Sequence, residues 1–144
     1  MHTPEQQALS SLRVERTGVP IYVQIREQFL AAIGAGTLSP GSRMPTMRQV
    51  SVALSVDLNT VRHAYDDLER SGVIVLRQGL GSFVAAQPPA PDPAERERAL
   101  DLLAGQTLGL ALATGLDPTL LCERIAALAK ASRSAAEPLA GDPR

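Results

Sequence analysis

Three polar side chains in one short stretch carry the chemistry that bears most directly on function. Asn59, Thr60 and Arg62 lie close together in the sequence, so a helix would place them on its first turn. An asparagine amide can form two hydrogen bonds with an adenine edge, and an arginine guanidinium can do so with guanine or bind a phosphate. A threonine can bond a phosphate or cover a thymine methyl. This combination is typical of a helix end that faces double-stranded DNA.

Capping residues and apolar spacing predict the elements that must position these side chains. Pro20 suits the first turn of a helix, and apolar residues follow it at four-residue steps, at Ile21, Ile25, Phe29 and Ile33. Thr46 and Gln49 have the spacing of a capping box, which predicts that a second helix begins there. Asp57 can cap a third helix, whose expected apolar face comprises Val61, Tyr65 and Leu68.

The third helix is expected to follow the second after a short turn at residues 55–57, which is the spacing of a helix-turn-helix. In that motif the later helix enters the major groove and presents its first turn to the base edges. A short β-branched run at residues 73–76 and a second short strand expected at residues 82–85 flank a glycine-rich turn and predict a β-hairpin. The sequence therefore predicts a winged helix-turn-helix over residues 17–86, with the hairpin as the wing.

Beyond this domain the composition changes. Residues 87–93 are rich in proline and indicate a stiff linker. Residues 94–134 contain two leucine-rich helical stripes, the second starting at the cap and proline of Asp117-Pro118. Two such helices cannot bury their stripes alone, so we predict a dimerisation tail that uses Leu100, Leu103, Leu110, Leu121, Ile125 and Leu128. Residues 1–16 and 135–144 are expected to be flexible, and the expected fold class is mostly α with a small β-hairpin.

Composition also indicates what the protein is not. The single cysteine, Cys122, excludes an internal disulfide and a multi-cysteine zinc site, and we expect its thiol to be buried. The two histidines, His2 and His63, have no partners in a recognisable catalytic or metal-binding pattern. We therefore expect neither an enzyme nor a metal or cofactor site. The chain starts without a charged-then-apolar leader, and its most apolar stretch contains Asp101, so we expect a cytoplasmic protein without a membrane span.

Several runs of residues resemble the GntR family of bacterial winged-helix regulators. They are PIYVQI at 20–25, GTLSPGSRMPTMR at 36–48, NTVRHAYDDLE at 59–69 and RQGLGSFV at 77–84. The short helical tail and the Asn-Thr-Val-x-x-Ala-Tyr pattern resemble the YtrA-type subfamily. The resemblance implies a homodimer that binds an inverted-repeat operator. For this subfamily it also implies a repressor, commonly of an operon for a membrane transporter.

The resemblance further implies which residues contact DNA. Carried over by position, the contacts from the helix-turn-helix are Arg48, Asn59, Thr60 and Arg62, and those from the wing are Gln78 and Gly79. We add Arg43 and His63, the latter because it is expected on the exposed side of the third helix. The sequence departs from the family at Asp57 and Leu58, where many members have serine or threonine followed by arginine. Leu58 cannot replace the hydrogen bonds of that arginine, so the operator cannot be copied from other members.

Two other hypotheses remain open at this point. The net charge of −1 does not favour nucleic acid, so DNA binding must rest on a local surface. That charge and the departure at Asp57 and Leu58 also fit a winged helix that docks a protein partner instead of DNA. A third hypothesis is a sensor whose apolar dimer cleft binds a small-molecule effector, and this hypothesis is compatible with DNA binding.

Overall fold

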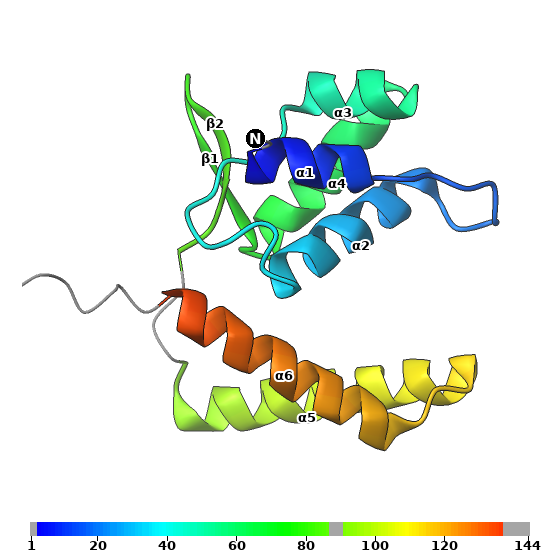
Figure 1. Cartoon of the computed structure of the whole chain (residues 1–144), viewed down its shortest axis with the longest axis vertical. Helices are drawn as coiled ribbons and strands as arrows, with labels where there is room; N and C mark the ends of the chain where they lie inside the picture. Colours follow the sequence, from blue (N-terminus) through cyan, green and yellow to red (C-terminus); the bar gives the residue numbers. More distant parts are fainter. Residues whose placement is uncertain (1–2, 87–90, 137–144) are drawn as a thin grey trace, which may run out of the picture. The chain divides into compact units, whose positions relative to one another are not determined.

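A computed structural model describes residues 3–86 and 91–136 of the chain. The chain divides into two units, Met1–Gln87 and Pro88–Arg144, which are described separately below. The described residues contain six α-helices and one two-stranded antiparallel sheet (Figure 1). The predicted fold class, mostly α with a small β-hairpin, is confirmed.

The first unit is built around one central helix. Its elements are α1 (Pro4–Ser11), α2 (Ile21–Gly34), α3 (Met47–Leu54), α4 (Leu58–Arg70), β1 (Ile74–Arg77) and β2 (Gly81–Val84). Helix α4 packs against α2, α3 and β1 (Figure 1). The fully buried core side chains include Ile25, Phe29, Val50, Val61, Tyr65 and Leu68. The apolar stripe predicted for α4 is therefore its core face, whereas on α2 the stripe is buried at Ile25 and Phe29 but exposed at Ile21.

Hydrogen bonds at the starts of α3 and α4 confirm the predicted caps. The Oγ1 atom of Thr46 accepts from the backbone N–H of Gln49 at 3.1 Å, and Oε1 of Gln49 accepts from the backbone N–H of Thr46 at 2.9 Å. At the next helix, Oδ1 of Asp57 accepts from the backbone N–H of Asn59 at 2.6 Å. Each cap satisfies backbone groups that the first helical turn leaves free, so local sequence fixes where both helices begin.

The turn between α3 and α4 contains a residue other than glycine in the left-handed region. Ser55 has a φ of 53° and ends α3. The hydroxyl of Ser51 donates to the backbone carbonyl of Val56 at 2.7 Å, which ties the turn to the last turns of α3. A left-handed residue after a helix reverses the chain within a few residues. The first turn of α4 is thereby held at a fixed orientation to α3.

Tyr65 connects α4 to the loop that precedes α3. Its hydroxyl donates to the backbone carbonyl of Pro45, and its ring meets the ring of Phe29 edge-on with centroids 5.6 Å apart. Burial raises the pKa of the Tyr65 phenol above its ordinary value, and the negative charge of Glu5 raises it further. The phenol therefore stays neutral in the folded protein well beyond neutral pH.

The predicted wing is present, with each strand displaced by one residue from the expected range. The strands pair from Ile74 with Val84 to Arg77 with Gly81. Gly79, in the connecting loop, has a φ of 78°, which glycine adopts without steric cost. Arg43, in the loop before α3, forms an isolated bridge with Phe83 of β2. The wing is therefore anchored to the same loop that leads into α3.

The expectation that residues 1–16 are flexible is wrong for the residues from 3 onward. Helix α1 has its own capping box, in which Thr3 and Gln6 satisfy each other's backbone N–H groups. Ala8 and Leu12 lie in the core at 3 % and 4 % exposure, and α1 packs against α3. The burial of these two apolar side chains stabilises a segment that looks polar and irregular in the sequence.

The segment after α1, residues 12–16, is held along α2 and is called the strap below. Gln24 of α2 accepts from the backbone N–H of Glu15 at 2.9 Å and donates to its carbonyl at 2.8 Å. Likewise, Gln28 accepts from the backbone N–H of Arg13 at 2.8 Å and donates to its carbonyl at 2.5 Å. Four helical residues advance about 6 Å, and two extended residues advance about 6.5 Å. Two glutamines one turn apart on α2 therefore match alternate residues of the strap.

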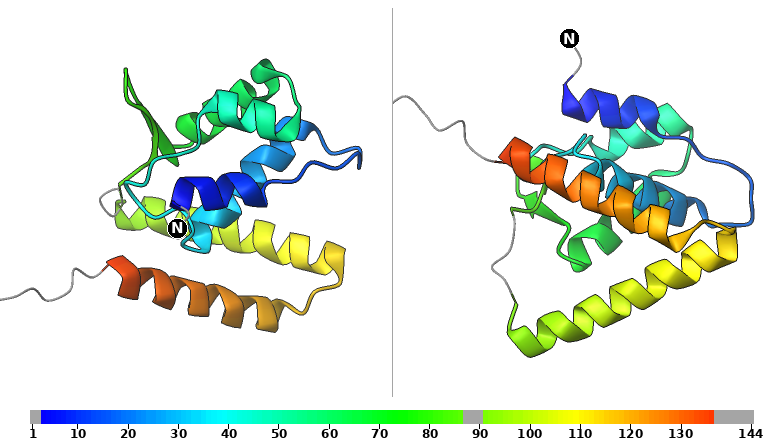
Figure 2. Two further views of the ribbon diagram at one scale, coloured as in Figure 1. Left: turned by 45° about the horizontal axis from the view of Figure 1, so that its top comes forward. Right: turned by 60° about the horizontal axis from the view of Figure 1, so that its bottom comes forward.

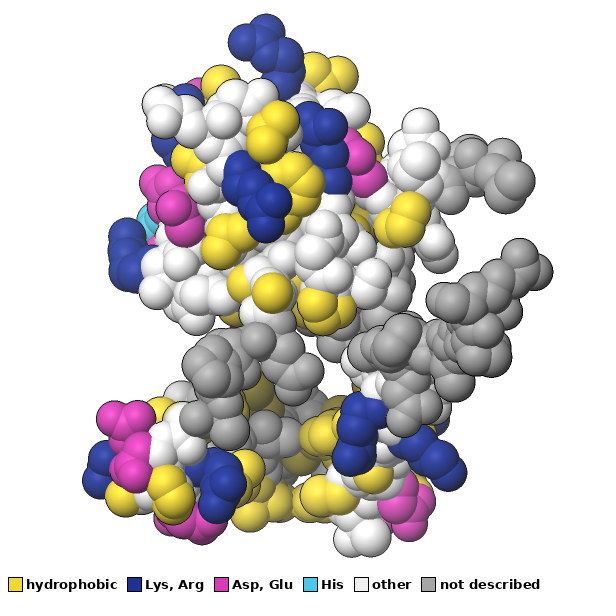
Figure 3. Space-filling model, turned by 90° about the vertical axis from the view of Figure 1, so that its left-hand side faces the viewer, with side chains coloured by type: hydrophobic (Ala, Val, Ile, Leu, Met, Phe, Trp, Pro, Cys, Tyr) yellow, Lys and Arg dark blue, Asp and Glu magenta, His cyan; other side chains and the backbone are white. Residues whose placement is uncertain are grey.

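The second unit is a helical hairpin. It consists of α5 (Pro93–Thr114) and α6 (Pro118–Ala136), and α5 ends at Gly115 with a φ of 75° (Figure 2). Between the helices lies a cavity of about 470 Å³ with a largely apolar lining. Figure 3 shows hydrophobic side chains facing the space between the two helices. Among the described residues, no helix is long and apolar enough to span a bilayer.

The predicted dimerisation residues fall into two groups on this hairpin. Leu100, Leu103, Leu121 and Ile125 line the cavity, whereas Leu110 and Leu128 lie outside its lining and are 69 % and 38 % exposed. Cys122 also lines the cavity, and its thiol is exposed, so the expectation that it is buried is wrong for the single chain. One hairpin supplies too few neighbours to cover either the thiol or the leucines.

Candidate nucleic-acid interface

The first turn of α4 carries the most informative side chains of the first unit. Asn59 and Arg62 are exposed, and Thr60 between them is half-buried. The two exposed side chains are bonded to each other, because Nη1 of Arg62 donates to Oδ1 of Asn59 at 2.8 Å. Leu58, at the first position of the helix, is half-buried. Asp57, which caps this end of α4 through the backbone N–H of Asn59, is itself exposed.

Arg48 is the predicted contact that lies on α3. It occupies the second position of that helix, next to the capping box of Thr46 and Gln49, and its side chain is exposed. Helix starts carry a partial positive charge. An arginine at this place can therefore meet a phosphate together with the N–H groups of the helix start.

Two arginines lie at the wing. The guanidinium of Arg43 lies against Gly81, where a Cβ atom would be 3.5 Å from its Nη2 atom. The guanidinium carbon of Arg77 lies 5.3 Å from the centre of the Phe83 ring, at the distance of a cation–π contact. Within residues 3–86 and 91–136, neither arginine forms an ion pair with a carboxylate. Both positive charges are therefore available to an anion.

Arg77 was not among the contacts predicted from sequence. The signal that could have found it is positional, because Arg77 pairs with Gly81 and is a diagonal neighbour of Phe83 on the same face of the hairpin. The predicted wing residues Gln78 and Gly79 follow it in the loop and are exposed. The wing thus presents an arginine at the end of its first strand, directly before a short loop that contains Gly79.

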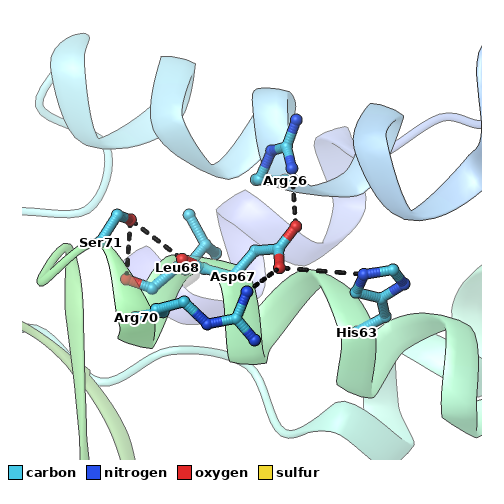
Figure 4. Close-up of polar contacts among 6 residues, drawn as sticks. All are labelled: Arg26, His63, Asp67, Leu68, Arg70 and Ser71. Atoms are coloured by element: carbon cyan, nitrogen blue, oxygen red, sulfur yellow. Dashed lines mark hydrogen bonds and ion pairs between the residues drawn. The ribbon is translucent and has the colours of Figure 1, made fainter.

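His63 is exposed as predicted, but its ring also takes part in packing between α2 and α4 (Figure 4). It stacks on the ring of Tyr22 with centroids 3.7 Å apart, and its Nε2 atom is 3.8 Å from Oδ1 of Asp67. Asp67 also pairs with Arg26 at 2.7 Å and Arg70 at 3.5 Å. This cluster locks the orientation of α4 on α2, while the first turn of α4 stays outside it.

The described residues do not group into a site for metal chemistry. Across residues 3–86 and 91–136, no three histidine, cysteine or carboxylate side chains are close enough together to hold a metal ion. The exposed polar side chains predicted from sequence at the α3 start, the α4 start and the wing are instead mainly hydrogen-bond donors and cations. Groups of this kind are the ones that proteins use to contact phosphates and base edges.

Comparison with known proteins gives matches in sequence. Residues 21–84 match the family model described as "Bacterial regulatory proteins, gntR family". The HTH-type transcriptional regulator Rv1152 of Mycobacterium tuberculosis is 35 % identical over 106 residues, which cover 73 % of this chain and 83 % of that protein. The HTH-type transcriptional repressor YtrA of Bacillus subtilis is 34 % identical over 70 residues, which cover 49 % of this chain and 54 % of that protein.

Solved structures share the fold. A transcriptional antiterminator from Listeria monocytogenes EGD-e superposes with a TM-score of 0.55 at 28 % identity, covering 82 % of this chain and 85 % of that one. YtrA from Sulfolobus acidocaldarius, a GntR-family transcription factor, superposes with a TM-score of 0.52 at 26 % identity, covering 68 % of this chain and 97 % of that one.

Proposed function

Since the chain belongs to the GntR family of bacterial regulatory proteins, and is thus a DNA-binding transcriptional regulator and not an enzyme, we propose that it acts as a homodimeric repressor on an inverted-repeat operator. The observation that carries the proposal is the exposed first turn of α4, where Asn59 and Arg62 lie free of the core. Repression is supported by the name of the relative YtrA from Bacillus subtilis. We expect the protein to work in the cytoplasm, where an operator is accessible.

We assign DNA contacts to three neighbouring parts of the first unit. Asn59, Thr60 and Arg62 enter the major groove at the base edges. The remaining contacts are to phosphates or to the minor groove, from Arg43, Arg48, Arg77, Gln78 and Gly79. His63 contributes mainly by holding α4 through Tyr22 and Asp67.

The second unit supports the homodimer. A hairpin of two helices that leaves Leu103 at 61 % and Leu110 at 69 % exposure has more apolar surface than it can cover by itself. A second copy of the hairpin is the natural cover, because identical apolar faces are self-complementary about a two-fold axis. Two α4 helices placed by such an axis would read half-sites about one helical turn of DNA apart. The two-fold axis relates the two half-sites and is what makes the operator an inverted repeat.

The dimer is tested by light scattering coupled to size exclusion. We expect the mass of two chains for the wild type and of one chain for the variant Leu103→Asp together with Leu121→Asp. The control is Gln106→Asp, an exposed position of α5 outside the cavity lining, which should remain dimeric. A monomeric wild type at micromolar concentration would refute the homodimer.

DNA binding and repression are tested on the promoter upstream of the chain's own operon. We expect a retarded complex on that fragment, a footprint with two-fold symmetry, and higher reporter output when the gene is deleted. Affinity should fall steeply with salt, because arginine–phosphate contacts release counterions. A shallow salt dependence without a footprint would favour the protein-docking hypothesis instead. A thermal shift with a metabolite that also weakens the complex would identify an effector, for which the cavity between α5 and α6 is the expected place.

A further inference from the structure

The bond between Asn59 and Arg62 changes what the first turn of α4 can read. The two residues are three apart on α4, so their side chains share one face of the helix. Nη1 of Arg62 donates to Oδ1 of Asn59 at 2.8 Å, and both side chains are exposed. The nearby carboxylate of Asp57 caps the helix through the backbone N–H of Asn59, and within the described residues it forms no ion pair with Arg62. Arg62 is therefore free to use Asn59 as its partner.

This bond makes the pair a surface of hydrogen-bond donors. One of the two lone pairs on Oδ1 of Asn59 is engaged by the guanidinium, whose positive N–H groups repel a base amino group brought to the same oxygen, and the Nδ2 atom keeps two N–H groups. The guanidinium keeps its other N–H groups as well. A lone asparagine presents one donor and one acceptor side by side, which suits adenine. The bonded pair presents donors and a positive charge instead.

The two purines differ in how they meet such a surface. Guanine offers two acceptors in the major groove, N7 and O6, whereas adenine offers the acceptor N7 and a donor amino group at N6. Against adenine, the amino group would meet the N–H groups of Arg62, donor against donor. Against guanine, every polar atom of the edge finds a donor. The pair therefore favours guanine over adenine at the same position.

We propose that Asn59 and Arg62 act as one unit that specifies a guanine in each operator half-site, with Arg62 turning Asn59 from an adenine reader into a guanine reader. The inference rests on the proposed sequence-specific binding and deepens it. It differs from the simpler alternative, in which Asn59 pairs with adenine and Arg62 only contacts a phosphate. In that alternative, the two side chains would act independently.

The test begins with selection of sites from randomised duplexes by the full-length chain. In the enriched site, the guanine assigned to the pair is replaced by adenine, by 7-deazaguanine, which lacks the N7 acceptor, or by inosine. Inosine keeps N7 and O6, so it is the matched control for the change of base. We expect about a tenfold loss of affinity with adenine and with 7-deazaguanine, and little change with inosine.

Protein variants then separate the two alternatives. We expect Arg62→Ala to lower the ratio of guanine to adenine affinity about tenfold, because Asn59 regains its acceptor, and Asn59→Ala to lower the same ratio. The double variant should lose no more discrimination than either single variant, because the pair works as a unit. The control Arg48→Ala should weaken all sequences by one factor and leave the ratio unchanged.

Each result decides a different claim. Failure to enrich any sequence would refute sequence-specific binding itself. Enrichment of adenine at the position protected by α4 would overturn only the guanine assignment. An unchanged ratio in Arg62→Ala, with all affinities reduced equally, would show that Arg62 is a phosphate contact and would overturn the unit. An unchanged ratio in Asn59→Ala would show that Arg62 reads the base alone. That result would also overturn the proposal that Asn59 and Arg62 act as one unit.

Discussion

The side-chain amide of Gln24 binds the backbone of Glu15 at both its N–H and its carbonyl, at 2.9 Å and 2.8 Å. This is the pairing that a neighbouring β-strand would supply, formed here by a helix side chain. The pairing holds the strap, which follows α1, against α2.

The Gln24 bonds give the first prediction. Gln24→Ala should lower the free energy of unfolding by about 1–2 kcal/mol, because the backbone of the strap loses its partners. Hydrogen exchange at the Glu15 amide should become faster in the same variant. The measurement is urea unfolding together with exchange monitored by NMR. Gln7→Ala, an exposed position on α1, is the control and should stay within about 0.5 kcal/mol of the wild type. Equal losses in both variants would contradict the role of Gln24.

Asp67 should matter far more than its neighbour Asp66. Asp67 is 15 % exposed at its side chain and pairs with Arg26, Arg70 and His63. Asp67→Asn should lower the free energy of unfolding by about 2 kcal/mol, since the arginines lose the negative charge they pair with and one acceptor oxygen becomes an NH₂ donor. Asp66→Asn, at an exposed position, is the control and should have little effect. A double-mutant cycle with Arg26→Ala should give a positive coupling energy for Asp67 and none for Asp66.

The raised pKa of Tyr65 predicts a loss of stability at alkaline pH. Because the phenol is harder to ionise in the folded than in the unfolded protein, stability is unaffected below the ordinary tyrosine pKa of about 10 and falls as the pH rises above it. In Tyr22→Phe, Tyr65 is the remaining tyrosine. Its tyrosinate absorbance should then appear only as the helical circular dichroism is lost. Ionisation of the phenol in a chain that stays folded would contradict this prediction.

Arg77 should contribute charge to DNA binding without contributing specificity. Arg77→Ala is expected to weaken specific and nonspecific duplexes by a similar factor and to reduce the slope of log affinity against log salt by about one. The control is Arg70→Ala at the other end of α4, whose side chain is 78 % exposed beside Asp67. Its slope should equal that of the wild type. A change of sequence preference in Arg77→Ala would mean that the wing reads bases.

The sequence predicts the structure best where all the interacting residues lie within one helical turn. Thr46 with Gln49, and Asp57 with Asn59, form their bonds within three residues, so the starts of α3 and α4 were predicted correctly. The strap was missed because its partners lie nine and fifteen residues away, on a helix whose glutamines look like ordinary surface residues. Cys122 was misjudged for a similar reason, because apolar neighbours in sequence do not show how far a single hairpin covers a thiol.

The candidate interface was predicted in its composition but not in its internal bonds. Asn59 and Arg62 are each identifiable by residue type, but nothing in the sequence indicates that their side chains are bonded to each other. The coupling depends on rotamers that bring Nη1 and Oδ1 to 2.8 Å across one turn. Side-chain geometry of this kind follows from the folded surface, so it could be found only there.

The bonds from Gln24 and Gln28 to the strap also determine which residues positions 13 and 15 can accept. In Glu15 and Arg13, the atoms that Gln24 and Gln28 bind all belong to the main chain, so these bonds place no demand on the side chains at positions 13 and 15. Relatives that keep both glutamines should therefore accept almost any residue at these two positions. Proline is the exception, because it lacks the N–H that each amide oxygen needs.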